Sequence, residues 1–386
     1  MKNAMKVLFA ASMLTGLVSA GAVHAQADND VQVVEGESLS KFIRSNTAHF
    51  WTYMRTDADL SAIKGLLKFE GIGAGDPHMG NFAPIPVLKG GKNRMAFLDV
   101  DFDDAGQAPL ILDFVRYMVA VKADFPDIKK KDLEEAYLRG LAGKTVEAPK
   151  PLQKFLDLSW DEYQAEAADY TEKKTKGDGF KLKPGEIESY SAEIKRSSIE
   201  ELFKGRGEKV VDIATRPEAV GGSAGSTRIW ILADTTEGRR IMELKEYAPS
   251  AIGNYQKQDD PGTWVKAVRA AFWPGYAADT YDLVRVEGKF FWLRQKQVSL
   301  IDVPRSSQKA RKLAYAEGLA IYDANLLGLA HGRQEGGADY LAALEAKGKD
   351  MHKSLGKIVN DYMDAANAAF SSKNCESALD RKKGRR

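Results

Sequence analysis

Strand-type sequence lies between two regions of helix-type sequence, and this order restricts the fold of the chain more than any other feature. Paired apolar and aromatic runs on either side of short turn-forming segments predict two β-hairpins. The expected strands cover residues 227–233, 239–247, 281–287 and 290–298. Apolar residues at helical spacing predict helices before and after this block, and the combination predicts an α+β fold with a large helical content. The expected helices lie within 39–67, where there are two, and over 110–122, 308–329 and 340–370.

The N-terminus has the pattern of a cleavable export signal. Lys2 and Lys6 precede a weakly apolar run over 7–23, which is followed by His24 and Ala25. A positive start, an apolar stretch and a small-residue cleavage site are the three parts of a secretory signal peptide. Serine, threonine and glycine residues interrupt the run, so it is poorly suited to span a bilayer. We expect cleavage after Ala25 and a periplasmic or secreted protein with no membrane span once the signal is removed.

The chain that this cleavage would leave carries no net charge. Residues 1–25 contain two of the 56 lysines and arginines and none of the 54 acidic residues, so equal numbers remain. A balanced chain lacks the positive excess typical of nucleic-acid-binding proteins, and we expect no nucleic-acid partner. Cys375 is the only cysteine, which excludes a disulfide within the chain and a cysteine metal site.

The segment most suggestive of chemistry is a glycine-rich loop followed by a strand that ends in acids. Residues 71–84 contain four glycines and two prolines around Asp76, and Asn81 follows five positions later. The acids at the end of the strand are Asp99, Asp101, Asp103 and Asp104. Kinase-type phosphoryl-transfer enzymes use this arrangement: one Asp accepts the proton of the acceptor hydroxyl, while the Asn and a later Asp hold Mg²⁺.

Each half of this pattern also has a simpler explanation. A Gly-Asp-Pro sequence is common in turns, and a strand that ends in acids can be an exposed edge or a calcium-binding loop. Mg²⁺ prefers hard oxygen ligands, and phosphoryl transfer depends on positioning and charge compensation. The ordered combination of the two motifs favours a kinase-like fold over these simpler explanations.

The motifs together resemble a known bacterial family. Its pattern is Gly-Asp-x-His-x-x-Asn-Phe, then Asp-Phe-Asp followed by Asp or Glu, then a Pro, an Asp and an Arg in the next helix. The last three are Pro109, Asp113 and Arg116 in this chain. Over most of its mature length the chain resembles the family described as domain of unknown function 2252, which is grouped with the protein-kinase-like fold, close to aminoglycoside and choline phosphotransferases. The resemblance implies a two-lobed kinase-like fold.

The resemblance also implies roles for individual residues. Asp76 would be the catalytic base. Asn81 and Asp101 would bind Mg²⁺, and Asp103 or Asp104 would supply a further ligand or charge. The residues expected to support this loop through hydrogen bonds, without touching substrate, are His78, Asp113 and Arg116. His331, which matches another family position, is expected to interact with the dipole at its helix end.

A second glycine-rich segment, residues 221–228, leads directly into a strand. At this place the family has Gly-x-Gly-Ser-x-Gly, with a Lys-Glu pair on the next strand. The residues that would contact ATP or another phosphoryl donor are Gly222, Ser223, Gly225 and Lys245. Val220 replaces the first family glycine, and a glycine-rich hairpin can also be purely structural. Because this loop follows Asp76 instead of preceding it, the resemblance implies a circularly permuted order.

Strand alternation gives an expectation for Lys245. Met242 and Leu244 are apolar, so Glu243 and Lys245 share the opposite face of their strand with Ile241. That face is either exposed or lines a polar site. If it lines the site, Lys245 is expected to approach Asp101 or a buried Glu.

We also expect Asp76, Asn81 and Asp101 to face one cleft, with their oxygens within reach of one metal ion.

Two functions from different classes fit the sequence. The first is an exported Mg²⁺-dependent phosphotransferase that acts on a small molecule or an envelope component. The alternative is a non-catalytic periplasmic protein of the pseudokinase kind that binds a metal or ligand. The presence of Asp76, Asn81 and Asp101 favours the first, whereas Val220 and the expected scarcity of ATP outside the cytoplasm favour the second. The expected segments are the signal peptide 1–25, the catalytic-loop region 26–143, connecting helices 144–206, the strand-rich lobe 207–300 and C-terminal helices 301–386.

Overall fold

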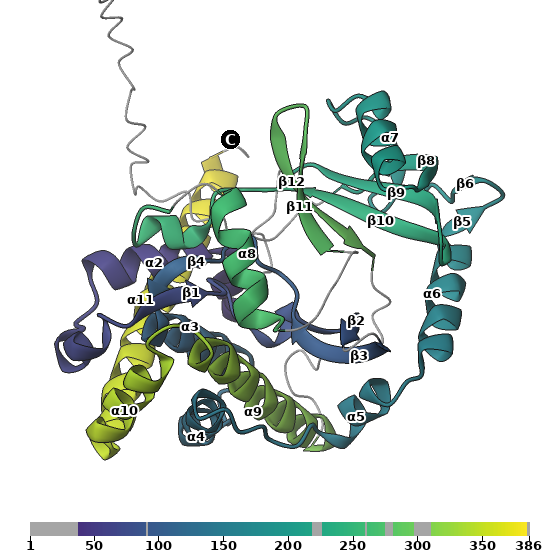
Figure 1. Cartoon of the computed structure of the whole chain (residues 1–386). Helices are drawn as coiled ribbons and strands as arrows, with labels where there is room; N and C mark the ends of the chain where they lie inside the picture. The colour runs from purple at the N-terminus through teal and green to yellow at the C-terminus, as the bar shows by residue number, and fades with distance from the viewer. Residues whose placement is uncertain are drawn as a thin grey trace, which may run out of the picture. The chain divides into compact units, whose positions relative to one another are not determined.

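The computed structural model describes residues 38–89, 92–217, 226–258, 261–274, 281–296 and 310–383, and residues 31–386 form one compact unit (Figure 1). Helices and antiparallel sheets both contribute to this unit, which confirms the α+β class. The expected signal peptide, residues 1–25, lies outside the described residues. The glycine-rich loop with Gly222, Ser223 and Gly225 lies outside them as well.

Helices make up most of the described regular structure. The helices are α1 (Leu39–Ser45), α2 (Thr47–Thr56), α3 (Leu110–Asp124), α4 (Lys130–Leu141), α5 (Lys150–Leu156), α6 (Trp160–Lys174), α7 (Arg196–Gly205), α8 (Pro261–Phe272), α9 (Ala310–Gly332), α10 (Gly337–Lys347) and α11 (Lys349–Lys383), with 3₁₀ turns η1 (Ser61–Leu66), η2 (Met79–Asn81) and η3 (Ala251–Asn254). The helical structure expected over 340–370 is confirmed, and it is divided into two helices. Gly348, with φ of 51°, separates α10 from α11, because this backbone conformation ends a helix and favours glycine.

The largest sheet has six strands in the order β11-β12-β10-β9-β8-β7, and neighbouring strands are antiparallel. Its strands are β7 (Glu188–Ser189), β8 (Lys209–Thr215), β9 (Arg228–Thr235), β10 (Gly238–Glu246), β11 (Tyr281–Val286) and β12 (Lys289–Gln295). β9–β10 and β11–β12 are the two hairpins that the turn signals predict. Gly238 and Gly288 turn the chain with φ of 99° and 85°.

The two faces of β10 have different neighbours. Met242 and Leu244 belong to an apolar cluster that includes residues of α7, which covers this face of the sheet. Ile241, Glu243 and Lys245 lie on the opposite face, as strand alternation predicts. Glu243 and Lys245 are 0% and 1% exposed, so the polar part of this face is enclosed by protein.

The sheet begins earlier in the chain than residue 207, where the strand-rich lobe was expected to start. β7 pairs with β8, and α7 packs on the sheet through Ile199 and Phe203. α6 also contacts the body of the protein, because Tyr163 and Ala167 cluster with Met95. The segment 144–206 is therefore only partly a connector.

Three further sheets have two strands each. They are β1 (Glu70–Gly73) with β4 (Gly106–Pro109), β2 (Phe82–Lys89) with β3 (Lys92–Asp99), and β5 (Thr175–Lys176) with β6 (Gly179–Phe180). β3 was expected, but β1 and β2 fall at the two ends of a segment expected to be loop. Pro84 and Pro86 argue against a strand in the interior of a sheet, yet a two-stranded ribbon tolerates them because each strand has an unpaired edge.

α3 is the buried centre of the helical part. Pro109 is the N-cap residue of α3. The helix contacts α1, α9 and α11 (Figure 1). α4 and α9 pack very closely, because glycines face the other helix's backbone. A methyl group on Gly140 or Gly328 would lie 2.2 Å from a carbonyl oxygen of the partner helix.

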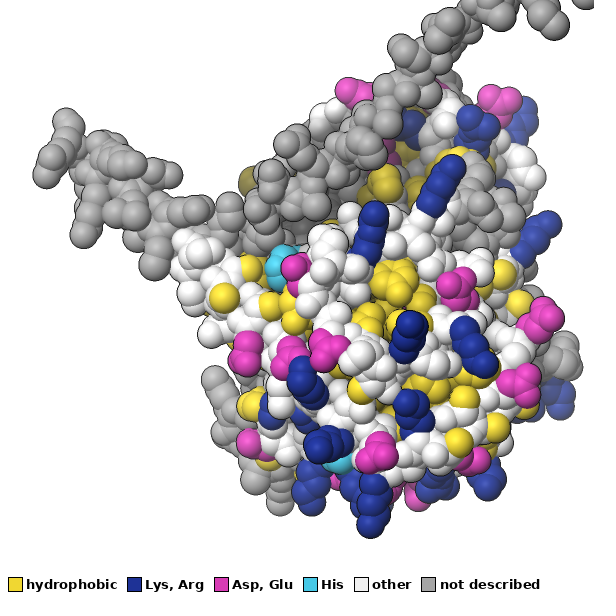
Figure 2. All heavy atoms as spheres, turned by 90° about the vertical axis from the view of Figure 1, so that its left-hand side faces the viewer, with side chains coloured by type: hydrophobic (Ala, Val, Ile, Leu, Met, Phe, Trp, Pro, Cys, Tyr) yellow, Lys and Arg dark blue, Asp and Glu magenta, His cyan; other side chains and the backbone are white. Residues whose placement is uncertain are grey.

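The described surface carries both signs of charge. Figure 2 shows basic and acidic side chains interspersed over the face that it presents. None of the helices in the described ranges combines the length and the apolar character needed to cross a membrane.

Candidate functional site

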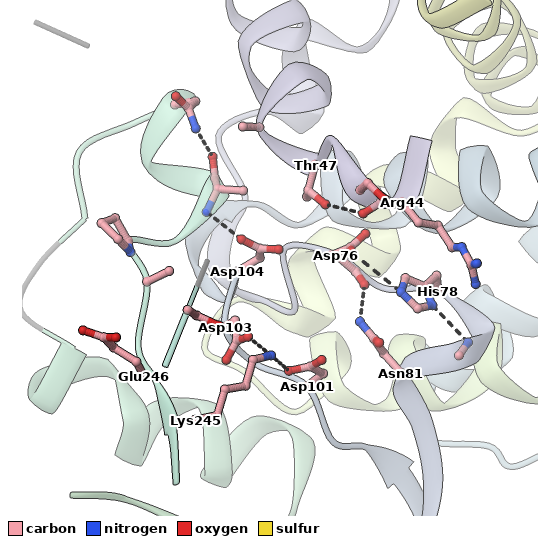
Figure 3. A pocket seen from close by; sticks show the side chains of 18 of the residues that line it. Arg44, Thr47, Asp76, His78, Asn81, Asp101, Asp103, Asp104, Lys245 and Glu246 are labelled. Atoms are coloured by element: carbon pink, nitrogen blue, oxygen red, sulfur yellow. Dashed lines mark hydrogen bonds and ion pairs between the residues drawn. The ribbon is translucent and has the colours of Figure 1, made fainter. Parts of the chain in front are cut away.

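A cavity of about 480 Å³ lies where the Asp76 loop, the acid-rich end of β3 and the strand β10 meet (Figure 3). Its lining includes Asp76, Asn81, Asp101, Asp103, Asp104 and Lys245. The expectation that Asp76, Asn81 and Asp101 face one cleft is therefore met. Ser226 and Arg228, the first described residues after the glycine-rich loop, also line it.

Asp76 is held by a buried arginine. Arg116 donates from Nη2 and Nε to Asp76 Oδ1 at 2.7 and 3.0 Å, and its side chain is 0% exposed. Nη2 also donates to the carbonyl of Ile43 at 2.8 Å. His78 Nε2 lies 3.7 Å from Asp76 Oδ2. Arg116 thus orients the carboxylate through one oxygen and leaves Oδ2 for a molecule in the cavity.

The imidazole of His78 is neutral at neutral pH. Burial lowers the pKa of His78, and Arg44 and Arg116 lower it further, while Asp76 opposes them. His78 Nδ1 accepts a hydrogen bond from the Gly80 N–H at 3.0 Å, so Nε2 carries the ring proton. His78 therefore presents an N–H toward Asp76 and shapes the turn that leads to Asn81.

Asp113 supports the loop from behind, as expected. Its Oδ2 and Oδ1 accept hydrogen bonds from the backbone N–H groups of Ala74 and Gly75 at 2.9 and 2.8 Å. His331 Nε2 lies 3.1 Å from Asp113 Oδ2, and its Nδ1 lies 2.7 Å from the Tyr137 hydroxyl. The expectation that His331 mainly serves its helix dipole is corrected, since the ring bridges Asp113 and Tyr137.

Gly75 and Asp104 meet at a tight backbone contact. Gly75 has φ of 81°, and a methyl group there would lie 1.8 Å from the carbonyl oxygen of Asp104. Asp104 in turn accepts hydrogen bonds from Ala251 N at 3.0 Å and, on its carbonyl, from Ser250 Oγ at 2.6 Å. Burial, followed by the charges of Asp76 and Asp103, raises the pKa of Asp104 to about 7.

Asn81 ties the loop to the strand end. Its side-chain Nδ2 donates to the backbone carbonyl of Asp76 at 3.0 Å, and the backbone carbonyl of Asn81 accepts from the N–H of Val100 at 2.8 Å. This arrangement fixes the amide and leaves its Oδ1 as the oxygen available to a ligand.

Lys245 forms the expected ion pair with the acids of the strand end. Its Nζ lies 3.2 Å from Asp101 Oδ1 and also contacts Asp103 Oδ2. Burial alone would raise the pKa of Asp101, but Lys245 and then Arg294 outweigh it and lower that pKa to about 2. Burial and the neighbouring Asp101 raise the pKa of Asp103. Burial would lower the pKa of Lys245, but Asp101 and Asp103 raise it, so Lys245 is charged at neutral pH.

Glu243 is a buried acid close to the ion pair of Lys245, and the sequence motifs assign it no role. Glu243 Oε2 accepts from Arg294 Nε at 2.7 Å, and its Oε1 accepts from Trp230 Nε1 at 3.2 Å. Arg294 also lies 3.9 Å from Asp101 Oδ1. The sequence does show that Glu243 is a charged residue on the same strand face as Lys245. It does not show that Arg294 is its partner, because that contact depends on the pairing of β10 with β12.

The lining offers oxygen donors of the chemical kind that Mg²⁺ takes when it is bound together with a phosphorylated ligand. Within the described ranges, no three His, Cys, Asp or Glu side chains gather closely enough to hold a metal by themselves. Asn81 and Asp101 offer two hard oxygen donors, and Asp103 Oδ1 is buried without a hydrogen-bond partner. Mg²⁺ commonly binds through one or two carboxylates and takes its other ligands from phosphates and water.

Comparison of the chain with models of known protein families, with curated proteins and with solved structures found no match.

Proposed function

We propose that this chain is an exported, Mg²⁺-dependent phosphotransferase with a circularly permuted kinase-like fold. It would transfer a phosphoryl group from a phosphoanhydride, such as a nucleoside triphosphate, to a hydroxyl group of a small molecule or an envelope component. The observation that carries the proposal is the cavity itself, which is lined by Asp76, Asn81 and Asp101 and by Lys245, a residue distant from them in the sequence.

The proposed chemistry needs one base and an in-line displacement. The acceptor oxygen forms a bond to the terminal phosphorus of the donor, and the bond from that phosphorus to the leaving oxygen breaks, with its electron pair remaining on the leaving group. The hydroxyl proton passes to Asp76 Oδ2, the oxygen that Arg116 does not occupy. A positioned base of this kind contributes on the order of 10²- to 10⁴-fold to the rate.

The other lining residues would compensate charge. Asn81, Asp101 and Asp103 would hold Mg²⁺, which supplies charge neutralisation on the donor phosphates. Lys245 would pair with those phosphates. In the structure its Nζ pairs with Asp101 and Asp103, and it would turn to the phosphates where these acids hold Mg²⁺ instead.

The same ion pair favours a second candidate function. Because Lys245 already pairs with Asp101 and Asp103, these two acids have a cationic partner without a metal, as suits a protein that binds a ligand without catalysis. The two functions differ in whether turnover depends on Asp76.

A binding screen tests the proposal. The melting temperature of the protein would be measured with ATP, GTP, pyrophosphate or polyphosphate, each with and without Mg²⁺. A ligand that binds only the folded state raises the melting temperature by mass action. We expect stabilisation by at least one donor that requires Mg²⁺, is lost in Lys245→Ala and is kept in the exposed control Lys209→Ala.

The ligand-free melting temperature of Lys245→Ala shows whether that variant folds. The Mg²⁺ dependence of the unmodified chain is an independent readout. Stabilisation by no donor, or equal stabilisation with and without Mg²⁺, would count against the proposed function.

A further inference from the structure

Two cations of α1 line the side of the cavity next to the Asp76 loop. Lys41 and Arg44 both belong to this lining, and Figure 3 shows Arg44 and Thr47 on the far side of Asp76 from Lys245. The guanidinium of Arg44 lies beside Gly80 of the Asp76 loop. A methyl group on Gly80 would lie 3.7 Å from Arg44 Nη1. This side of the cavity is separate from the Lys245 ion pair.

Four of the five acids that line the cavity have cationic partners, and the fifth, Asp104, accepts a hydrogen bond from the backbone N–H of Ala251. Asp76 pairs with Arg116, Asp101 and Asp103 pair with Lys245, and Glu246 lies 3.2 Å from Lys289. None of these five acids lies within 4.0 Å of Lys41 or Arg44.

The two cations of α1 are different. Within the part of the chain that the structure describes, neither Lys41 nor Arg44 has a carboxylate within 4.0 Å. Arg44 Nε is buried and has no hydrogen-bond acceptor there. A buried donor without a partner is unfavourable, and an anion bound beside it would supply the missing acceptor.

The local backbone adds to the positive potential. α2 begins at Thr47, in the lining of the cavity, and has no acidic residue in its first turn. The N-terminal end of a helix carries partial positive charge. Arg44 also lies in the last turn of α1, where a cation is favourable, but this placement does not explain a buried Nε without an acceptor.

From Arg44, Lys41 and the start of α2, we infer that this side of the cavity binds an anionic group, a phosphate or a carboxylate, of the acceptor substrate. That the bound molecule is the acceptor rests on the proposed function. The acceptor is then a hydroxyl compound with a negative charge, held with its hydroxyl at Asp76 and its anionic group at Arg44. A cationic acceptor of the aminoglycoside or choline type does not fit these residues.

The test measures anion binding directly. The melting temperature of the protein would be followed with inorganic phosphate, acetate or choline as the probe, up to tens of millimolar and at constant ionic strength. The variants are Arg44→Ala, Arg44→Lys and Arg139→Ala. Arg139 is a matched control because it is an exposed arginine in the last turn of another helix, α4.

We expect phosphate or acetate to stabilise the unmodified protein, with an affinity that falls at least fivefold in Arg44→Ala, recovers partly in Arg44→Lys and is unchanged in Arg139→Ala. Lys245→Ala, measured in parallel, reports any phosphate bound on the opposite side of the cavity. No stabilisation by either anion, an Arg44→Ala variant that binds like the unmodified protein, or stronger stabilisation by choline overturns the inference.

The outcome is separable from that of the donor screen. If Arg44→Ala loses anion binding while no donor binds with Mg²⁺, the anion site stands and the proposed function fails. If a donor binds with Mg²⁺ but Arg44 has no effect on anions, the proposed function stands and this inference fails.

Discussion

Arg116 and Lys245 divide the neutralisation of the acids in the cavity between them. Arg116 is fully buried and fixes Asp76, whereas Lys245 contacts the two acids at the end of β3. A carboxylate enclosed by protein is costly unless it is paired and hydrogen-bonded. The two cations therefore allow acidic side chains to gather in one enclosed space.

Removing the cation that holds Asp76 is expected to destabilise the fold. Arg116→Met keeps much of the apolar volume but leaves the Asp76 carboxylate and the Ile43 carbonyl without their donor. Breaking a buried pair on one side costs about 3–5 kcal/mol, and we expect a loss near 3 kcal/mol because Asp76 is partly exposed. Urea unfolding measures it. Arg139→Ala, the exposed control, should change the free energy of unfolding by less than about 0.5 kcal/mol, and equal stability of both variants would contradict the assignment.

Asp104 gives a prediction about pH. Its pKa is raised from 3.8 to about 7 in the folded protein, so the unfolded chain loses this proton at lower pH than the folded chain does. The contribution of Asp104 to stability therefore falls as the pH rises from about 4 to 7 and is lowest above 7. Asp104→Asn keeps the acceptor for Ala251 but cannot ionise.

We expect the free energy of unfolding of Asp104→Asn, relative to that of the unmodified protein, to be larger at pH 8 than at pH 5 by about 2–3 kcal/mol. Urea unfolding at the two pH values measures this difference. The same relative stability at both would show that Asp104 does not titrate as described.

At the scale of elements, local signals in the sequence were sufficient to predict the two hairpins. Other strands form only through contacts between residues far apart in the sequence, which local signals do not show. Turn residues around Gly238 and Gly288 predict β9–β10 and β11–β12, and alternation places Lys245 on the inner face. β1 and β4 are four residues each, too short for a clear pattern, and form because they pair with one another. The partnership of Glu243 with Arg294 likewise depends on the pairing of β10 with β12.

The Asp76 loop is expected to tolerate no side chain at Gly75. Gly75→Ala would place a methyl group against the Asp104 carbonyl at a positive φ, and we expect a loss of at least about 3 kcal/mol from overpacking and backbone strain. Gly143 has a similar φ of 73° with open space around it, so Gly143→Ala should cost only about 1 kcal/mol. Thermal unfolding compares the two, and an equally mild effect at both positions would argue against the tight contact.

At the scale of the whole molecule, the cavity is assembled from segments far apart in the chain. α1 contributes Arg44, the loop after β1 contributes Asp76, and β10 contributes Lys245. The motifs in the sequence identified the loop and the lysine, because their residue types carry recognisable chemistry. They did not identify Arg44, since an arginine near a helix end has no distinctive pattern and its place in the cavity follows only from the packing of α1.

The expected route out of the cytoplasm has a simple test. If the apolar run after Lys6 is a cleaved signal, the protein recovered from the periplasm or medium begins at Gln26. Mass spectrometry of the intact protein measures this directly. Recovery from the cytoplasm with Met1 retained would contradict export.

The central claim is tested most directly by the turnover of the phosphoryl donor in Asp76→Asn, with water or an added hydroxyl compound as the acceptor. Turnover of a Mg²⁺-bound donor would be measured for the unmodified protein and for this variant, with the donor's dissociation constant determined by calorimetry on the same samples. Asn keeps the shape of the side chain and the hydrogen bond from Arg116 but is a poor proton acceptor. We predict turnover that falls at least about 100-fold in the variant while donor affinity stays within about threefold. Turnover that is undetectable in the unmodified protein despite tight donor binding, or that is unchanged in Asp76→Asn, would contradict phosphoryl transfer at this site.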